Sequence, residues 1–349
     1  MKHFFVIVLW GFFNSCTPGS VPLLPAQDYD FSPHLHYLAS DSLQGRLAGS
    51  RYDSLTAVYI RNTLLHCGYA PLCEEGWQPF EYKVAKRGSN KPGTRFSRNV
   101  VMISTPYDTS ACAETVVLGA HFDHLGLGGW GSRRADTAAV HNGADDNASG
   151  VAMLLELAKK ITQYPAPLKR NVVIVAFGAE ELGLIGSNHF VRNLPPHSGK
   201  IVLMINFDMV GRLDTLRRLE IGGLTSFAGA DSLLYTLPNP DSLTFFFPSH
   251  IKRNSDHAPF YAAGIPVLFF HTGLHADYHT PDDDVDKINL SGMHAIAHFA
   301  DSLIRWAVTT EKPPVFQQTD IARKSSLLYE RVEHILKVFD RKHLISQTI

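Results

Sequence analysis

Short apolar runs alternate with helix-like stretches over most of the chain, and this alternation constrains the fold more than any other feature. The predicted strands are rich in β-branched or aromatic residues and end in glycine or a polar cluster: "ETVVLGAH", "KRNVVIVAFGAEE", "KIVLMINFDMVG" and "IPVLFFHTG". The stretches with helical patterning are "ASGVAMLLELAKKI", "GLIGSNHFVRNL", "SDHAPFYAAG" and "SGMHAIAHFADSLIRWAV". Buried strands alternating with helices predict an α/β three-layer sandwich, in which helices cover both faces of a mostly parallel central sheet.

The region before the first of these strands is less regular. Leu55, Ile60, Leu64 and Leu65 have roughly helical spacing, which predicts a helix within 53–69. Residues 83–98 are basic, polar and contain glycine and proline, so we expect a loop there, followed by a strand in "RNVVMIS".

The first sixteen residues are typical of an export signal. A basic start at Lys2 precedes an apolar run from Phe4 to Phe13, which is too short to cross a bilayer as a helix. Ser15-Cys16 then resembles a bacterial lipobox, in which Cys16 becomes the lipidated first residue. We therefore expect a periplasmic or outer-membrane lipoprotein whose only membrane contact is a lipid anchor at Cys16. An ordinary cleaved signal and secretion remain the alternative.

The end of this signal marks the start of the main domain, and the helix-breaking segment "EKPP" marks its end. We expect a signal peptide at 1–16, a catalytic domain at 17–310 and a helical tail at 311–349. The formal net charge is −1, so electrostatics give no reason to expect binding to nucleic acid.

The remaining cysteines are Cys67, Cys73 and Cys112, and no two of them form a CxxC pair. A zinc site built on thiolates is therefore not expected. Three cysteines allow at most one intramolecular disulfide, most simply Cys67 with Cys73.

Acidic residues and histidines occur where the predicted strands end or where a helix begins. Ligands of an open α/β sheet bind beyond the carboxyl ends of its strands, so these side chains are candidates for one site. They are His121, Asp123, Asp145, Glu180, Glu181, Asp208 and His279.

Each candidate has an ordinary explanation when taken alone. A single histidine such as His121 is usually a hydrogen-bonded core residue, an acidic pair such as Glu180-Glu181 usually caps a helix, and "DDD" at 282–284 is usually a solvated turn. Five unrelated caps have no reason to gather at one sheet edge, however. Imidazole and carboxylate ligands without thiolates suit zinc, and less specifically cobalt or manganese. Five protein ligands suit two metals bridged by one carboxylate.

The same residues carry a resemblance to a family. The segments "GAHFDHLG", "NGADDNASGVAMLLEL", "AFGAEELGLIGS", "NFDMVG", "SDHAPFYAAGIP" and "YHTPDDDVDKI" resemble the co-catalytic di-zinc exopeptidases of clan MH, the bacterial leucyl aminopeptidase and glutamate carboxypeptidase group. The similarity extends from about Leu38 to Val308. It implies five metal ligands, with Asp145 bridging and joined to Asp146 by a cis peptide bond: His121, Asp145, Glu181, Asp208 and His279. It also implies that Glu180 is the general base and that Asp123 orients His121.

The resemblance implies an exported metallo-aminopeptidase that uses two Zn²⁺ ions, or cobalt or manganese in their place, to hydrolyse N-terminal residues from peptides. The alternative within the superfamily is a glutaminyl cyclase-like acyltransferase with a single zinc, against which His121 at the first ligand position argues. Only 70 residues separate Asp208 from His279, too few for the lid of the related carboxypeptidases and deacylases. A binding protein without catalytic activity is disfavoured because no ligand is missing. Segment 223–254 is rich in Phe and Leu and is expected to shape the substrate pocket, with Arg253 as an alternative contact for a substrate carboxylate.

Overall fold

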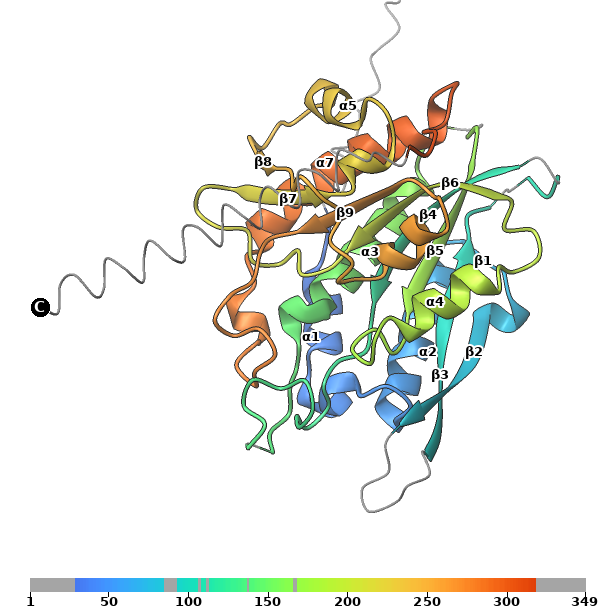
Figure 1. Ribbon diagram of the computed structural model, residues 1–349. Helices are drawn as coiled ribbons and strands as arrows, with labels where there is room; N and C mark the ends of the chain where they lie inside the picture. Colours follow the sequence, from blue (N-terminus) through green and yellow to red (C-terminus); the bar gives the residue numbers. More distant parts are fainter. Residues whose placement is uncertain are drawn as a thin grey trace, which may run out of the picture.

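A nine-stranded mixed sheet forms the middle layer of the protein (Figure 1). The computed structural model describes residues 29–84, 93–105, 108–110, 113–136, 138–165 and 168–317. The strands are β1 (Ala70–Pro71), β2 (Trp77–Val84), β3 (Gly93–Ile103), β4 (Glu114–His121), β5 (Asn171–Phe177), β6 (Lys200–Phe207), β7 (Arg218–Gly222), β8 (Thr244–Phe246) and β9 (Val267–His271). Their order across the sheet is β1-β3-β5-β4-β6-β9-β7-β8, with β2 paired to β3.

The centre of this sheet is parallel, as predicted. Strands β5, β4, β6 and β9 run parallel to one another. Antiparallel pairs flank them, because β3 pairs antiparallel with β1, β2 and β5, and β7 with β9. The loop predicted at 83–98 was therefore wrong at both ends, since β2 runs to Val84 and β3 starts at Gly93. Strand β2 buries every second side chain, so a polar composition is compatible with a strand there.

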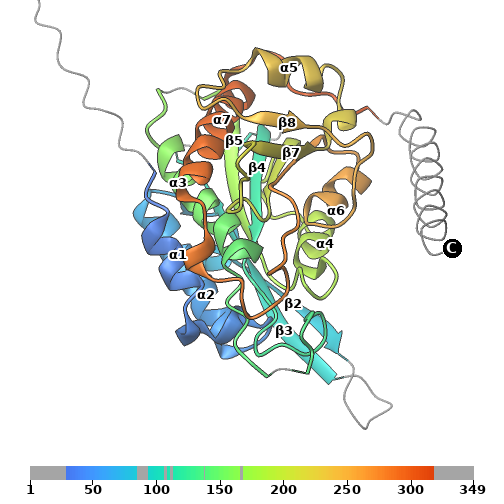
Figure 2. The same ribbon diagram turned by 90° about the vertical axis from the view of Figure 1, so that its left-hand side faces the viewer.

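Helices cover both faces of the sheet and confirm the predicted three-layer architecture (Figure 2). One face packs against α1 (Ser32–Leu38), α2 (Arg51–His66), α3 (Gly150–Ile161) and α7 (Leu290–Thr309). The other face packs against α4 (Ile185–Arg192) and α6 (His257–Ala262). The short helix α5 (Ala230–Thr236) lies near the β7–β8 edge.

The double cover explains why the central strands are apolar without interruption. All seven residues of β5 are buried. Val172 and Ile174 pack in the cluster that contains α3 and α7, whereas Val173 and Val175 pack in the cluster that contains α4 and α6. A strand with two buried faces loses the polar-apolar alternation that marks a half-exposed strand.

Several predictions concern residues that the structure does not describe. The export signal, Cys16, Cys112 and the tail beyond residue 317 are among them. Of the cysteines that are described, Cys67 and Cys73 are both free, so the simplest disulfide is not formed. Among the described helices, none combines the length and the apolar character needed to cross a bilayer.

Candidate metal centre

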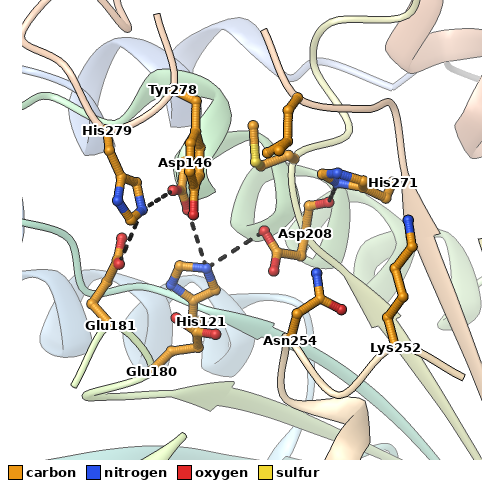
Figure 3. A pocket seen from close by; sticks show the side chains of 12 residues that line it. His121, Asp146, Glu180, Glu181, Asp208, Lys252, Asn254, His271, Tyr278 and His279 are labelled. Atoms are coloured by element: carbon orange, nitrogen blue, oxygen red, sulfur yellow. Dashed lines mark hydrogen bonds and ion pairs between the residues drawn. The ribbon is translucent and has the colours of Figure 1, made fainter. Parts of the chain in front are cut away.

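The predicted ligands meet at the carboxyl ends of the parallel strands, as the fold requires. His121 is the last residue of β4, Asp208 follows β6 directly, and Glu181 lies on the connection after β5. His279 comes from the longer connection between β9 and α7. These four residues, which are distant in sequence, line one cavity of about 330 Å³ (Figure 3).

Two sets of ligand atoms can be separated within this cavity. In the first, which we call the strand-end group, His121 Nε2 lies 3.3 Å from Asp146 Oδ1 and 3.6 Å from Asp208 Oδ1. In the second, the loop group, His279 Nε2 lies 3.1 Å from Asp146 Oδ2 and 3.2 Å from Glu181 Oε2. Asp146 therefore directs one carboxylate oxygen to each group (Figure 3).

The position of Asp146 corrects the prediction for Asp145. The Asp145 carboxylate points away from the cavity, where Oδ1 accepts hydrogen bonds from the Gly211 N–H at 2.6 Å and the Ser149 hydroxyl at 3.1 Å. Its Oδ2 lies 3.1 Å from His275 Nε2. The bridging position predicted for Asp145 is occupied by its neighbour Asp146. The cis peptide bond is displaced in the same way and joins Asp146 to Asn147.

The local backbone decides which aspartate faces the cavity. The chain leaves helical geometry at Asp146 and Asn147 within the turn that precedes α3. The Asn147 side chain then holds this turn against the end of β6, donating to the Phe207 carbonyl at 3.0 Å and accepting from the Met209 N–H at 3.2 Å. Asp283 accepts the N–H groups of Asp145 and Asp146, both at 3.0 Å. Asp283 is fully buried, so the prediction of a solvated turn at 282–284 was wrong at this residue.

Asp123 and Glu180 also lie at the site, and their contacts differ in part from the prediction. The Asp123 carboxylate accepts the N–H of Glu180 at 2.9 Å and that of Glu181 at 3.3 Å. His121 Nδ1 is closer to the Asp123 main-chain carbonyl, at 3.2 Å, than to the Asp123 carboxylate, at 3.9 Å. The main contact of the Asp123 side chain is therefore with the segment that carries the two glutamates, and the carbonyl of Asp123 orients His121.

The electrostatics of the cavity are those of crowded carboxylates. Burial, reinforced by the nearby carboxylates of Asp256 and Glu181, raises the pKa of Glu180 well above its usual value against the opposing effect of His121. Burial also raises the pKa of Asp123 to about 7. Although burial alone would raise the pKa of Asp146, hydrogen bonds from the imidazoles of His121 and His279 hold it well below its usual range. The site therefore favours positive charge close to Asp146.

His124 matches no ligand position in the sequence and was expected only at the edge of the site, but the structure places it in contact with a predicted ligand. Its Nδ1 lies 2.7 Å from Glu181 Oε1, and the ring is buried. His124, Asp146 and Glu181 form one set of residues whose donor atoms lie within 4.8 Å of one another, and His121, Glu180 and Asp208 form another. The signal was its place next to Asp123 in "HFDH", because a residue there follows the end of β4 as the ligands do.

A buried arginine holds the loops behind the site. Arg46 Nε donates to the Phe122 carbonyl at 2.8 Å, Nη1 to that of Asn142 at 2.6 Å and to that of Leu38, and Nη2 to that of Gly143 at 3.0 Å. Burial lowers the pKa of Arg46 to about 10. Its guanidinium thus fixes the segments that lead to Asp123 and Asp146, and no motif in the sequence indicated this role.

The cavity extends from the ligands towards a polar region beside Asp208. Lys252, Asn254 and His271 line it there (Figure 3). Lys252 Nζ lies 2.7 Å from Glu220 Oε1. Segment 223–254 thus reaches the cavity as predicted, although with Lys252 and Asn254 where its Phe-rich and Leu-rich composition had suggested an apolar lining.

Curated proteins of known activity are similar in sequence to this chain. Aminopeptidase YwaD of Bacillus subtilis is 27% identical over 249 residues, which cover 68% of this chain and 50% of that protein. Leupeptin-inactivating enzyme 1 of Streptomyces exfoliatus is 34% identical over 148 residues, which cover 41% of this chain and 32% of that protein. The chain thus spans about half or less of the length of these relatives.

Solved structures share the fold at lower identity. An aminopeptidase from Aneurinibacillus sp. strain AM-1 superposes with a TM-score of 0.64 at 18% identity, covering 84% of this chain and 97% of that chain. A glutaminyl cyclase from Porphyromonas gingivalis superposes with a TM-score of 0.61 at 19% identity, covering 80% and 99%. Peptidases and cyclases are therefore both represented among proteins of this fold.

The family itself is identified by a match over more than half of the chain. Residues 99–304 match Peptidase family M28, a segment that begins within β3 and ends within α7. It contains every strand-end and loop residue of the candidate metal centre. The chain belongs to peptidase family M28.

Proposed function

We propose that this protein is an exported zinc aminopeptidase with two metal ions per chain. The observation that carries the proposal is the sharing of Asp146 between the strand-end group and the loop group, one oxygen to each. A carboxylate that serves two ligand sets is the arrangement expected for a two-metal site. The names of the relatives support peptide hydrolysis as the reaction.

The donor atoms fit zinc. Each group supplies one imidazole nitrogen and two carboxylates, counting the shared Asp146, and leaves room for water or substrate. Four carboxylates converge on the cavity: Asp146, Glu180, Glu181 and Asp208. Burying such charges is costly unless cations compensate them, and in the described part of the chain the hydrogen bonds of Arg46 go to main-chain carbonyls and not to these carboxylates. Two divalent ions would supply the missing positive charge.

The residues of the chain itself provide proton transfer and positioning. When bound, the metal ions supply Lewis-acid activation of water and of the scissile carbonyl. Glu180 accepts a proton from the attacking water and passes it to the departing amine. Asp123 keeps Glu180 in place through the main-chain N–H that it accepts.

The charge of the cavity explains why we propose cleavage at the free N-terminus of a peptide. A cavity lined by four carboxylates favours a cationic α-ammonium group close to the scissile bond. The side chain of the first residue then faces the region of Met209, Lys252 and His271. An N-acetylated peptide lacks the cation and is expected to be a poor substrate.

Export remains part of the proposal on the strength of residues 1–16 alone. The apolar run ends at a cysteine placed as in a lipobox. We propose that Cys16 carries the lipid anchor of a periplasmic or outer-membrane lipoprotein.

Metal analysis combined with a Glu180→Gln variant tests the proposed function. We expect close to two zinc ions per chain in the wild-type protein, and release of free amino acids from unblocked peptides that stops on addition of a chelator. Glu180→Gln should keep both metals while kcat falls about 10²–10⁴-fold, because only the proton acceptor is lost. One zinc per chain together with conversion of N-terminal Gln to pyroglutamate would instead identify a cyclase.

A further inference from the structure

Two further hollows lie beside the metal centre on the side of Glu181. The nearer, of about 140 Å³, has Glu181, His124, Trp130 and Leu182 among its lining residues. The second, of about 410 Å³, shares Trp130 and Leu182 with it. Glu181 also lines the central cavity, so each hollow shares lining residues with the next. We call the apolar walls of the two outer hollows the apolar groove, formed by Leu47, Tyr82, Val84, Trp130, Leu182 and Ile185.

The groove has a packed floor and exposed walls. Tyr82 is buried in a small cluster with Ala48 and Ala179, and its hydroxyl donates to the Ala48 carbonyl at 2.8 Å. Trp130, by contrast, is 77% exposed, and Leu47 is 45% exposed. A single exposed apolar residue needs no explanation, but several around a preformed hollow that adjoins the candidate metal centre indicate a binding surface. A tryptophan wall offers a large apolar contact area with little conformational freedom to lose.

We propose that the apolar groove binds the residues that follow the scissile bond of the peptide substrate, and that it prefers apolar side chains there. This inference rests on the proposed peptidase function. The first residue of the substrate faces the opposite end of the cavity, where Lys252 and His271 lie beside Asp208 (Figure 3). The departing amine must reach Glu180 to receive its proton. The downstream chain therefore leaves on the side of Glu180 and Glu181, and Leu182 is the next residue there.

The charge distribution agrees with an apolar occupant. Among the described residues that line the outer hollow, Lys83 is the one with a basic or acidic side chain, and its Nζ donates to Thr94 Oγ1 at 2.7 Å and lies 3.8 Å from Glu81 Oε1. A charged downstream side chain would lose water contacts without gaining an unpaired opposite charge.

Comparing substrates with and without downstream residues tests the groove. The substrates are leucinamide, which has none, and the tetrapeptides Leu-Phe-Leu-Phe and Leu-Ser-Gly-Ser. In the wild-type protein, kcat/KM for the apolar peptide should exceed that for the polar one by about tenfold, the scale of one well-packed aromatic contact. In Trp130→Ala, the ratio of the apolar peptide to leucinamide should fall by a similar factor. Tyr235→Ala is the matched control, because Tyr235 is an equally exposed aromatic residue on α5 and should leave the ratio unchanged.

A binding measurement separates the groove from the catalytic proposal. The zinc-loaded Glu180→Gln protein should bind Leu-Phe-Leu-Phe about tenfold more tightly than Leu-Ser-Gly-Ser by calorimetry, and adding Trp130→Ala should abolish the difference. If the wild-type protein releases no amino acids but this binding difference is present, the peptidase function fails and the groove stands. Peptide release without any difference that depends on Trp130 overturns the groove. Loss of the Trp130-dependent difference is also the result expected if another part of the chain or a lipid, and not the substrate, occupies the apolar groove.

Discussion

The two ligand groups share Asp146 but differ in how the fold holds them. In the strand-end group, His121 ends β4 and Asp208 follows β6, and these strands are paired neighbours in the sheet. The two residues are 1% and 8% exposed. In the loop group, Glu181 and His279 come from connections, and His279 has a positive φ of 56°. One group is fixed by the sheet itself, and the other by contacts between loops.

The residues of the loop group are held in place by contacts with other loop residues, as His279 shows. Its Nδ1 donates to the Gly131 carbonyl at 2.8 Å, and its ring stacks on Tyr278 at 3.8 Å between centroids. The Glu181 carboxylate is held in turn by His124, whose Nδ1 lies 2.7 Å from Glu181 Oε1. Openings of loops cost less free energy than openings of central strands, so we expect a metal in the loop group to exchange faster.

The largest effect is expected where the two groups meet. Asp146→Asn removes the shared charge, so zinc content should fall from two to below one per chain and kcat/KM by about 10³-fold or more. Asp145→Asn is the matched control, since an amide oxygen can still accept the Gly211 N–H. It should retain both zinc ions. Equal loss of zinc from the two variants, measured by elemental analysis, would contradict the placement of Asp146 in both groups.

Removing one histidine from each group probes the difference directly. Zinc release to a chelating dye should occur in two phases whose rates differ by about tenfold or more, the loop group first. His279→Ala should eliminate the fast phase, because it removes a loop-group ligand. His121→Ala should eliminate the slow phase. A single phase in the wild-type protein would mean that the sheet and the loops hold metal equally well.

A smaller effect is expected from the residue that supports Glu181. His124→Gln should weaken zinc binding in the loop group by about 10–100-fold and leave the strand-end group unchanged, as is typical for a partner of a metal ligand. Competition with a chelator of known affinity measures both sites. His275→Gln serves as the control, because His275 contacts Asp145 and neither group. Weakening of both sites by His124→Gln would show that the groups are not independent.

The same contrast explains what the sequence could predict. His121 and Asp208 lie where apolar runs stop, so the pattern that predicts the strand also predicts the ligand. The parallel centre of the sheet was predictable for the same reason. The antiparallel strand β2 was not, because its alternating burial leaves half of its residues polar.

Residues that depend on loop geometry were harder to predict. A sequence pattern cannot distinguish two adjacent aspartates. The departure from helical geometry at Asp146 directs its side chain into the cavity, whereas the Asp145 carboxylate accepts the Gly211 N–H. Asp283 appeared to be a solvated residue because its buried position depends on main-chain N–H groups almost 140 residues away. Such partners leave no local trace in a sequence.

The hydrogen bonds of Arg46 indicate that the folding unit is longer than the segment that matches the family. The family match begins at residue 99, more than fifty residues after Arg46. A polypeptide restricted to 99–304 would leave the carbonyls of Phe122 and Asn142 without the Arg46 donor, and each unsatisfied buried group costs about 1–3 kcal/mol. We therefore expect the segment that matches the family to be less stable alone than within the whole domain. A chimera that exchanges the N-terminal helices between relatives must supply an arginine in the same place.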